Sequence, residues 1–173
     1  MKKFKAGFTL IELLIVIALL GALAVGLLAA LDPFEQLKKG NDTAVRNTVS
    51  EVQGSLVRYY ALKNILPWCS DPDTCSDPSG TNLSSSPMDV AISRVIDSGE
   101  LKKDFTSLAA NNLGKIWVTG VSTTNTAKVC FRPSSKSFKC DLNTKFDKNG
   151  EKISPDTNCT NNCGSNTCYW CVE

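Results

Sequence analysis

The feature that most constrains this chain is a stretch of 24 residues near its start, residues 8–31, in which Glu12 is the one charged side chain. A helix of that length spans roughly 36 Å at about 1.5 Å per residue, which is enough to cross a hydrocarbon core of about 30 Å. Three lysines precede the stretch: Lys2, Lys3 and Lys5. Lysines on this side favour a cytoplasmic amino terminus, so we expect the rest of the chain to face outward.

The acid within this stretch needs a partner. A carboxylate at the centre of a bilayer costs about 2.5–3.5 kcal/mol even on the mildest scale, so an acid in a membrane span indicates a functional residue. If the chain were cut after Gly7, the new amino group on Phe8 would be a cation four residues before Glu12. A cut at that bond would therefore supply the cation that Glu12 lacks.

These residues, in the sequence KAGFTLIELL, resemble the amino terminus of type IV pilins and of the pseudopilins of type II secretion. In that family a membrane-embedded aspartic peptidase cuts after the glycine and methylates the new terminal phenylalanine. The resemblance implies cleavage after Gly7, methylation of Phe8, and pairing of Glu12 with a neighbour's terminal amine during assembly. It is specific over residues 1–31 and only suggestive beyond them.

Two other interpretations explain less of this segment. A secretory signal peptide also has a basic start and an apolar stretch, and Ala22-Leu23-Ala24 is a possible cleavage pattern. The early acid and the continuation to Leu31 disfavour it. A plain membrane anchor explains the length of the stretch and leaves the Gly-Phe-x-x-x-Glu pattern unexplained.

Composition limits the functions open to the chain. Cleavage after Gly7 would remove three of the 19 basic side chains and change the formal charge from +2 to −1, so general nucleic-acid binding is not expected. The sequence contains no histidine, which excludes Ser-His-Asp and Cys-His nucleophiles and histidine metal sites. We predict no catalytic residues and no enzyme activity.

The rest of the sequence predicts an α+β fold, with a long helix packed on a small antiparallel sheet. Asp32-Pro33 predicts a kink after the apolar stretch. Residues 34–64 predict an amphipathic helix, and we favour one continuous helix although Gly40 is a possible interruption. Its apolar stripe needs a covering sheet and consists of Val45, Val49, Val52, Leu56 and Tyr59.

We divide the chain into four parts. They are a cleaved leader (1–7), a transmembrane or filament-core helix (8–31), its amphipathic continuation (32–66) and an extracytoplasmic head (67–173). In the head, a short helix is expected to begin at Ser86-Pro87 and end at Gly99. Strands are expected at residues 116–121, 127–132 and 137–142.

Eight cysteines in an exported chain predict disulfide bonds, and 105 full pairings leave the connectivity open. Cys69 and Cys75 could close a short ring in the loop of residues 67–87. Cys130 and Cys140 would be paired if they face each other across the second predicted hairpin. The cysteines are Cys69, Cys75, Cys130, Cys140, Cys159, Cys163, Cys168 and Cys171.

Metal and redox chemistry are the alternatives for the head. Zinc could be bound by the last four cysteines, although the four-residue spacer between Cys163 and Cys168 is short for a zinc site. Thioredoxin-like chemistry at Cys168 and Cys171 lacks a surrounding βαβ pattern. A calcium loop is a weaker possibility, with oxygen ligands from Asp147, Asn149 and Glu151. We favour a plain Asn-Gly turn for this segment. We predict no cofactor, with calcium as the alternative.

The resemblance implies a structural subunit of a type IV pilus-like filament. The alternatives are a major pseudopilin of a secretion system or a membrane-anchored metal or redox module. The implied partners are further copies of the chain, a prepilin peptidase and methyltransferase, and an inner-membrane platform with its ATPase. The precursor would cross the inner membrane once, and the assembled protein would lie in a periplasmic or surface filament.

Overall fold

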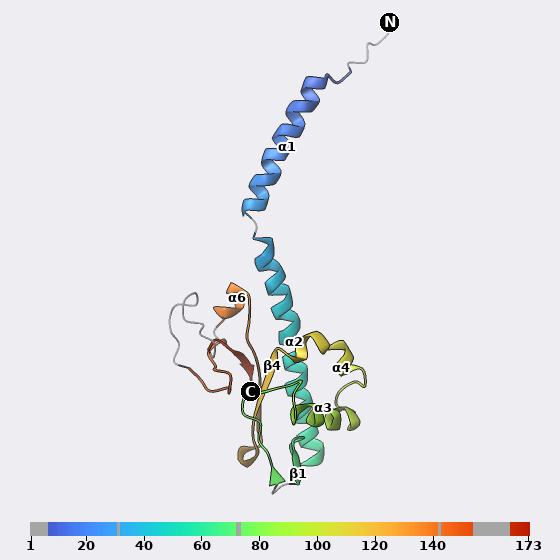
Figure 1. Ribbon diagram of the computed structural model, residues 1–173, viewed down its shortest axis with the longest axis vertical. Helices are drawn as coiled ribbons and strands as arrows, with labels where there is room; N and C mark the ends of the chain where they lie inside the picture. Colours follow the sequence, from blue (N-terminus) through green and yellow to red (C-terminus); the bar gives the residue numbers. More distant parts are fainter. Residues whose placement is uncertain (1–6, 31, 72–73, 142, 154–166) are drawn as a thin grey trace. The chain divides into compact units, whose positions relative to one another are not determined.

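The computed structural model describes residues 7–30, 32–71, 74–141, 143–153 and 167–173 (Figure 1). The chain forms two compact units that divide between Leu37 and Lys38. The first unit contains helix α1 (Leu10–Ala30) and the start of helix α2 (Pro33–Lys63). In the second unit, Lys38–Glu173, the rest of α2 packs against the sheet of the head.

The predicted kink at Asp32-Pro33 is confirmed as a break between two helices. Asp32 caps the second helix, since its Oδ1 accepts a hydrogen bond from the amide of Glu35 at 3.2 Å. Pro33 occupies the first helical position, where its missing N–H is no loss.

Helix α2 is continuous through Gly40, as favoured from the sequence. It ends at Lys63, where Asn64 adopts a left-handed conformation (φ 56°) and its amide donates to the carbonyl of Tyr60 at 2.7 Å. The predicted apolar stripe is confirmed as buried, and Asp42 and Ser55 are buried with it. Burying each large apolar side chain stabilises the fold by about 1.5–3 kcal/mol.

The sheet that covers this stripe has four antiparallel strands in the order β3-β4-β5-β6. The predicted strands at 116–121 and 127–132 are confirmed as β4 and β5, which pair from Ile116–Phe131 to Val121–Thr126. The strands are β3 (Thr81–Asn82), β4 (Ile116–Val121), β5 (Thr126–Phe131) and β6 (Trp170–Val172), and a separate two-stranded ribbon comprises β1 (Cys69–Asp71) and β2 (Thr74–Cys75). Alternate side chains of β4 and β5 enter the same core as the α2 stripe.

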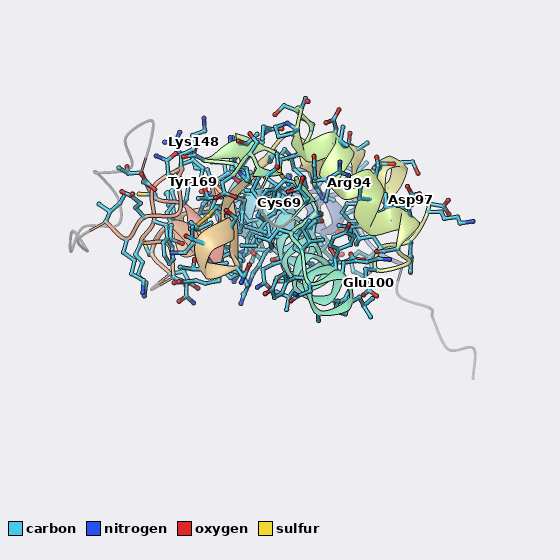
Figure 2. The ribbon with its side chains drawn as sticks, turned by 90° about the horizontal axis from the view of Figure 1, so that it is seen from below. Cys69, Arg94, Asp97, Glu100, Lys148 and Tyr169 are labelled. Atoms are coloured by element: carbon cyan, nitrogen blue, oxygen red, sulfur yellow. A yellow bond between two sulfur atoms is a disulfide. The ribbon has the colours of Figure 1, made fainter. Side chains whose placement is uncertain are left out.

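The connection between β3 and β4 carries three helices. They are α3 (Met88–Asp97), α4 (Phe105–Leu108) and α5 (Ala110–Leu113). Helix α3 starts just after the predicted Ser86-Pro87, and Gly99 (φ 85°) closes it as predicted. Arg94 of α3 donates to the carbonyls of Pro67 and Cys69, at 2.9 and 2.8 Å. Figure 2 shows α3, with Asp97, on the opposite side of the head from Lys148 and Tyr169.

The strand predicted at residues 137–142 is wrong. Residues 137–139 belong instead to the short helix α6 (Lys136–Lys139), which Ser135 caps by accepting a hydrogen bond from the Phe138 amide at 3.4 Å. Leu142 lies outside the described residues. The partner of β5 comes instead from the carboxyl end of the chain, as strand β6.

Candidate processing and assembly site

The predicted cleavage position lies just before the first helix. Gly7 and Phe8 lie outside any helix or strand and are exposed, with Phe8 81% accessible. A Cβ built on Gly7 would meet no atom within 4 Å. The bond between them is therefore presented without packing from the described residues. The three lysines of the predicted leader, Lys2, Lys3 and Lys5, lie outside the described residues.

Glu12 is part of a reciprocal cap on helix α1. Its Oε2 accepts hydrogen bonds from the Thr9 amide at 2.9 Å and the Thr9 hydroxyl at 2.7 Å. The Glu12 amide donates in return to Thr9 Oγ1 at 3.3 Å. This is the capping-box arrangement, in which a threonine and a glutamate three residues later satisfy the free donors of a helix start.

The cap uses one oxygen of the carboxylate. Within the part of the chain that the structure describes, Glu12 Oε1 accepts no hydrogen bond, while Oε2 accepts two. The positive end of the helix dipole also favours a negative charge in the first turn. Glu12 is thus held in one orientation with an oxygen available to a further donor.

Helix α1 is apolar on every side. Leu10–Leu28 is long and apolar enough to cross a membrane, and its large side chains are exposed to more than two fifths of their surface. A helix that is apolar all round requires a lipid or protein environment.

The disulfides of the head agree with one predicted pair and correct the other. Cys69 and Cys75 are bonded, which confirms the short ring. Cys130 is bonded to Cys171, so the predicted Cys130–Cys140 pair is wrong. The reason is that Cys130 and Cys171 face each other across the β5–β6 pair, while Cys140 follows a helix.

The zinc and redox alternatives at the last four cysteines are not supported. Cys168 and Cys171 are each disulfide-bonded, and Cys171 is paired with Cys130 rather than with Cys168. Thiolate ligands require free sulfur, so these two cannot complete a four-thiolate site. Cys159 and Cys163 lie outside the described residues. Cys140 is exposed at the end of α6.

A second group of possible ligands consists of Cys69, Cys75 and Asp77. Its two sulfurs form the ring disulfide, and its carboxylate is held by other contacts. Asp77 accepts hydrogen bonds from Trp68 Nε1 at 3.0 Å and from the amide and hydroxyl of Ser122 at 2.9 Å. The arrangement ties the ring to the end of β4, which is a structural role.

The predicted calcium candidates form a tight turn. The Asp147 Oδ1 accepts hydrogen bonds from the amides of Asn149 and Glu151, both at 2.8 Å. Gly150 has a φ of 74°, which glycine adopts without strain. This is the Asn-Gly turn favoured from the sequence, and calcium binding by Asp147, Asn149 and Glu151 stays an untested alternative.

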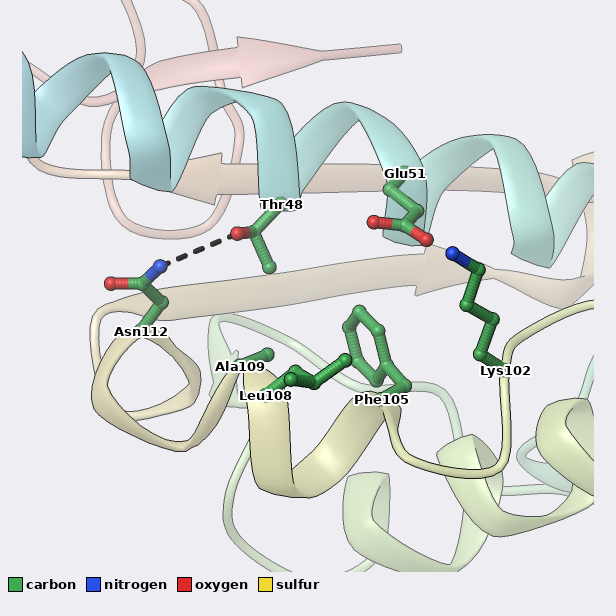
Figure 3. A pocket seen from close by; sticks show the side chains of 7 residues that line it. All are labelled: Thr48, Glu51, Lys102, Phe105, Leu108, Ala109 and Asn112. Atoms are coloured by element: carbon green, nitrogen blue, oxygen red, sulfur yellow. Dashed lines mark hydrogen bonds between the residues drawn. The ribbon is translucent and has the colours of Figure 1, made fainter.

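A shallow groove of about 170 Å³ lies between α2 and the helices α4 and α5 (Figure 3). Asn112 Nδ2 donates to Thr48 Oγ1 at 3.4 Å at one end, and Glu51 and Lys102 point toward one another at the other. Enclosed ligand sites have volumes of about 300–1,000 Å³. The groove is therefore smaller than an enclosed ligand site.

Comparison with known proteins identifies the amino-terminal motif. Residues 2–28 match the family described as the prokaryotic N-terminal methylation motif, which is the prepilin leader signature of type IV pilins and pseudopilins. No curated protein and no solved structure gave a significant match. The chain therefore carries a prepilin-type leader signature, and its long amino-terminal helix and α+β head are consistent with a pilin-like fold.

The matched motif indicates a structural protein of the pilin type, and such proteins are usually not enzymes. The leader and the apolar helix fit a precursor that crosses the inner membrane once and is later assembled into a surface filament. The residue that sequence reasoning missed is Thr9. The signal was available, because Thr-x-x-Glu before an apolar stretch is the capping-box pattern.

Proposed function

We propose that this protein is the structural subunit of a type IV pilus-like filament. A prepilin peptidase cuts between Gly7 and Phe8, and a methyltransferase modifies the new amino group of Phe8. The mature chain then polymerises through residues 8–31, with residues 32–66 continuing the helix and residues 67–173 forming the head outside the membrane.

The observation that carries this proposal is that only one carboxylate oxygen of Glu12 accepts hydrogen bonds from the described residues. Thr9 holds Oε2, and Oε1 has no donor among the described residues. The amine of a neighbouring copy's Phe8 is a donor of opposite charge, and a charge-assisted hydrogen bond is about twice as strong as a neutral one. The pair forms only when two copies are in the correct register, so it selects that register.

The energetics require an assembly machine. Burying the apolar side chains of α1 between copies is strongly favourable relative to water, at about 1.5–3 kcal/mol for each side chain. Relative to lipid, which is as apolar as leucine, the gain is far smaller. Extraction of the subunit therefore requires work, which we assign to an inner-membrane platform and its ATPase.

The test is a Glu12→Gln variant in the producing cells. The side chain keeps its shape and loses its charge, and a neighbour's amine would be left buried without a counter-charge, which costs about 3–5 kcal/mol. We expect normal loss of the leader and at least about a tenfold drop in sheared filaments. Glu51→Gln, an exposed acid on α2, is the control. Normal filaments from Glu12→Gln would contradict the register argument.

Natural expression and deletion of the gene separate the two destinations of such a subunit. Long filaments on the cell surface at natural expression would identify a pilus. Their absence, together with a processed subunit and a defect in protein export on deletion, would identify a secretion pseudopilus.

A further inference from the structure

Asp42 is the first residue of α2 that is buried, and its side chain is 4% exposed. Its carboxylate accepts hydrogen bonds from two residues that lie more than ninety positions later in the chain. The Ser134 amide and hydroxyl reach Oδ1 at 3.0 and 2.9 Å, and the Ser135 amide and hydroxyl reach Oδ2 at 2.7 and 2.6 Å. Charge-assisted bonds of this length are the strong ones.

These serines lie in a segment of residues 133–141, and part of the backbone bonding of this segment is local. The amides of Lys139, Cys140 and Asp141 donate to carbonyls within the segment, each at 3.1 Å. The amides of Ser134 and Ser135 donate to Asp42, and so to α2 rather than to a strand. The segment therefore does not share the β4–β5 ladder.

An aromatic contact adds to the polar one. The Phe138 ring is buried, 6.3 Å from the Phe131 ring and 6.0 Å from the guanidinium carbon of Arg46. Arg46 lies one turn after Asp42 on α2 and also covers the Trp170 ring at 4.9 Å. The segment is thus attached to one end of the buried face of α2 by Asp42 and Arg46.

We propose that Asp42 is a latch: it holds residues 133–141 on α2, and this segment opens and closes as a unit while the β4–β5 ladder stays intact. Proteins open locally in contiguous cooperative units, with free energies lower than that of global unfolding. When Asp42 is removed, two backbone donors and two hydroxyls lose their acceptor, and the closed form loses this polar support. The inference does not depend on the proposed filament function.

Hydrogen exchange on the full-length protein in detergent micelles tests the latch. In Asp42→Ala, the amides of residues 133–141 should exchange about ten- to a hundredfold faster than in the wild type. The amides of β4 and β5 should keep their wild-type rates. Ser134→Ala, which removes one hydroxyl donor, should give the same pattern with a smaller increase, so the test holds even if Asp42→Ala does not fold.

The matched control is Thr43→Ala, an exposed neighbour on the same helix, which should leave exchange in residues 133–141 unchanged. Two results would overturn the proposal. One is wild-type exchange of residues 133–141 in both Asp42→Ala and Ser134→Ala. The other is an equal acceleration of these residues and of β4 and β5, since the segment would then open only when the head unfolds.

Discussion

Thr9 and Glu12 hydrogen-bond to each other in both directions across the first turn of α1, with the Thr9 hydroxyl 2.7 Å from Glu12 Oε2 and the Glu12 amide 3.3 Å from Thr9 Oγ1. The pair gives the acid of the apolar stretch two donors before any cleavage takes place. An acid in this stretch therefore has partial support in the precursor, and under the proposed function its second oxygen is left for the donor that processing would create.

Thr9→Val should loosen the first turn of α1. Valine has the shape of threonine without the hydroxyl, and loss of an N-cap side chain costs about 1 kcal/mol. Amide exchange at residues 10–13 in micelles should rise about fivefold. Thr9→Ser keeps the hydroxyl and is the control. Equal protection in the valine and serine variants would show that the cap does not stabilise the turn.

Gly7→Val should leave uncut precursor. A Cβ at Gly7 meets no atom within 4 Å, so valine does not disturb the described chain, and an effect on cleavage must arise in the peptidase site. Immunoblotting should show one band at precursor size. Gly21→Val, also in open space, should still be cut. Full cleavage of Gly7→Val would place the processing site elsewhere.

Gly120→Ala should destabilise the head. A Cβ at Gly120 would overlap the ring of Trp68, which lies across β4 and is anchored by Asp77. Overpacking of this kind costs about 1–3 kcal/mol, which should lower the thermal midpoint by several degrees. Gly114→Ala, where a Cβ has open space, should leave the midpoint near that of the wild type. Equal midpoints for both variants would contradict the close approach.

The carboxyl of Asp77 should make the head less stable in acid. Burial alone would raise its pKa, but hydrogen bonds from Ser122 and Trp68 outweigh burial and hold the pKa below the usual 3.8. A lowered pKa in the folded state means that the ionised group stabilises the fold above the unfolded pKa, and that this stability is lost as the pH falls through the folded pKa.

Denaturant unfolding of the wild type and Asp77→Asn from about pH 6 to about pH 3 checks this prediction. The wild type should be more stable by a constant amount above about pH 5, and the difference should shrink below about pH 4. A difference that does not change with pH would show that the ionised carboxyl contributes nothing.

Local sequence patterns predicted the parts of this fold that local chemistry determines. The stripe from Val45 to Tyr59 follows helical spacing, and those positions are buried. The break at Pro33 and the end of α3 at Gly99 follow from backbone preferences of single residues. In these places one or two residues decide the conformation.

The errors arise where a distant partner decides the conformation. Residues 137–142 alternate as a strand would, but a cap at Ser135 and an acceptor at Asp42 hold the segment in another form. The edge of β5 is then free to pair with β6, which lies about forty residues further along the chain. Spacing along the chain does not contain that information, so the Cys130–Cys171 bond was not predictable from it.

The most direct measurement is the intact mass of the protein purified from sheared surface filaments. We predict a mass that lacks residues 1–7, carries one added methyl group, and is lower by eight hydrogens if all eight cysteines are paired. Fragmentation should place the methyl group on the amino nitrogen of Phe8. Protein found only in membranes, at the mass of the uncut chain, would contradict the account.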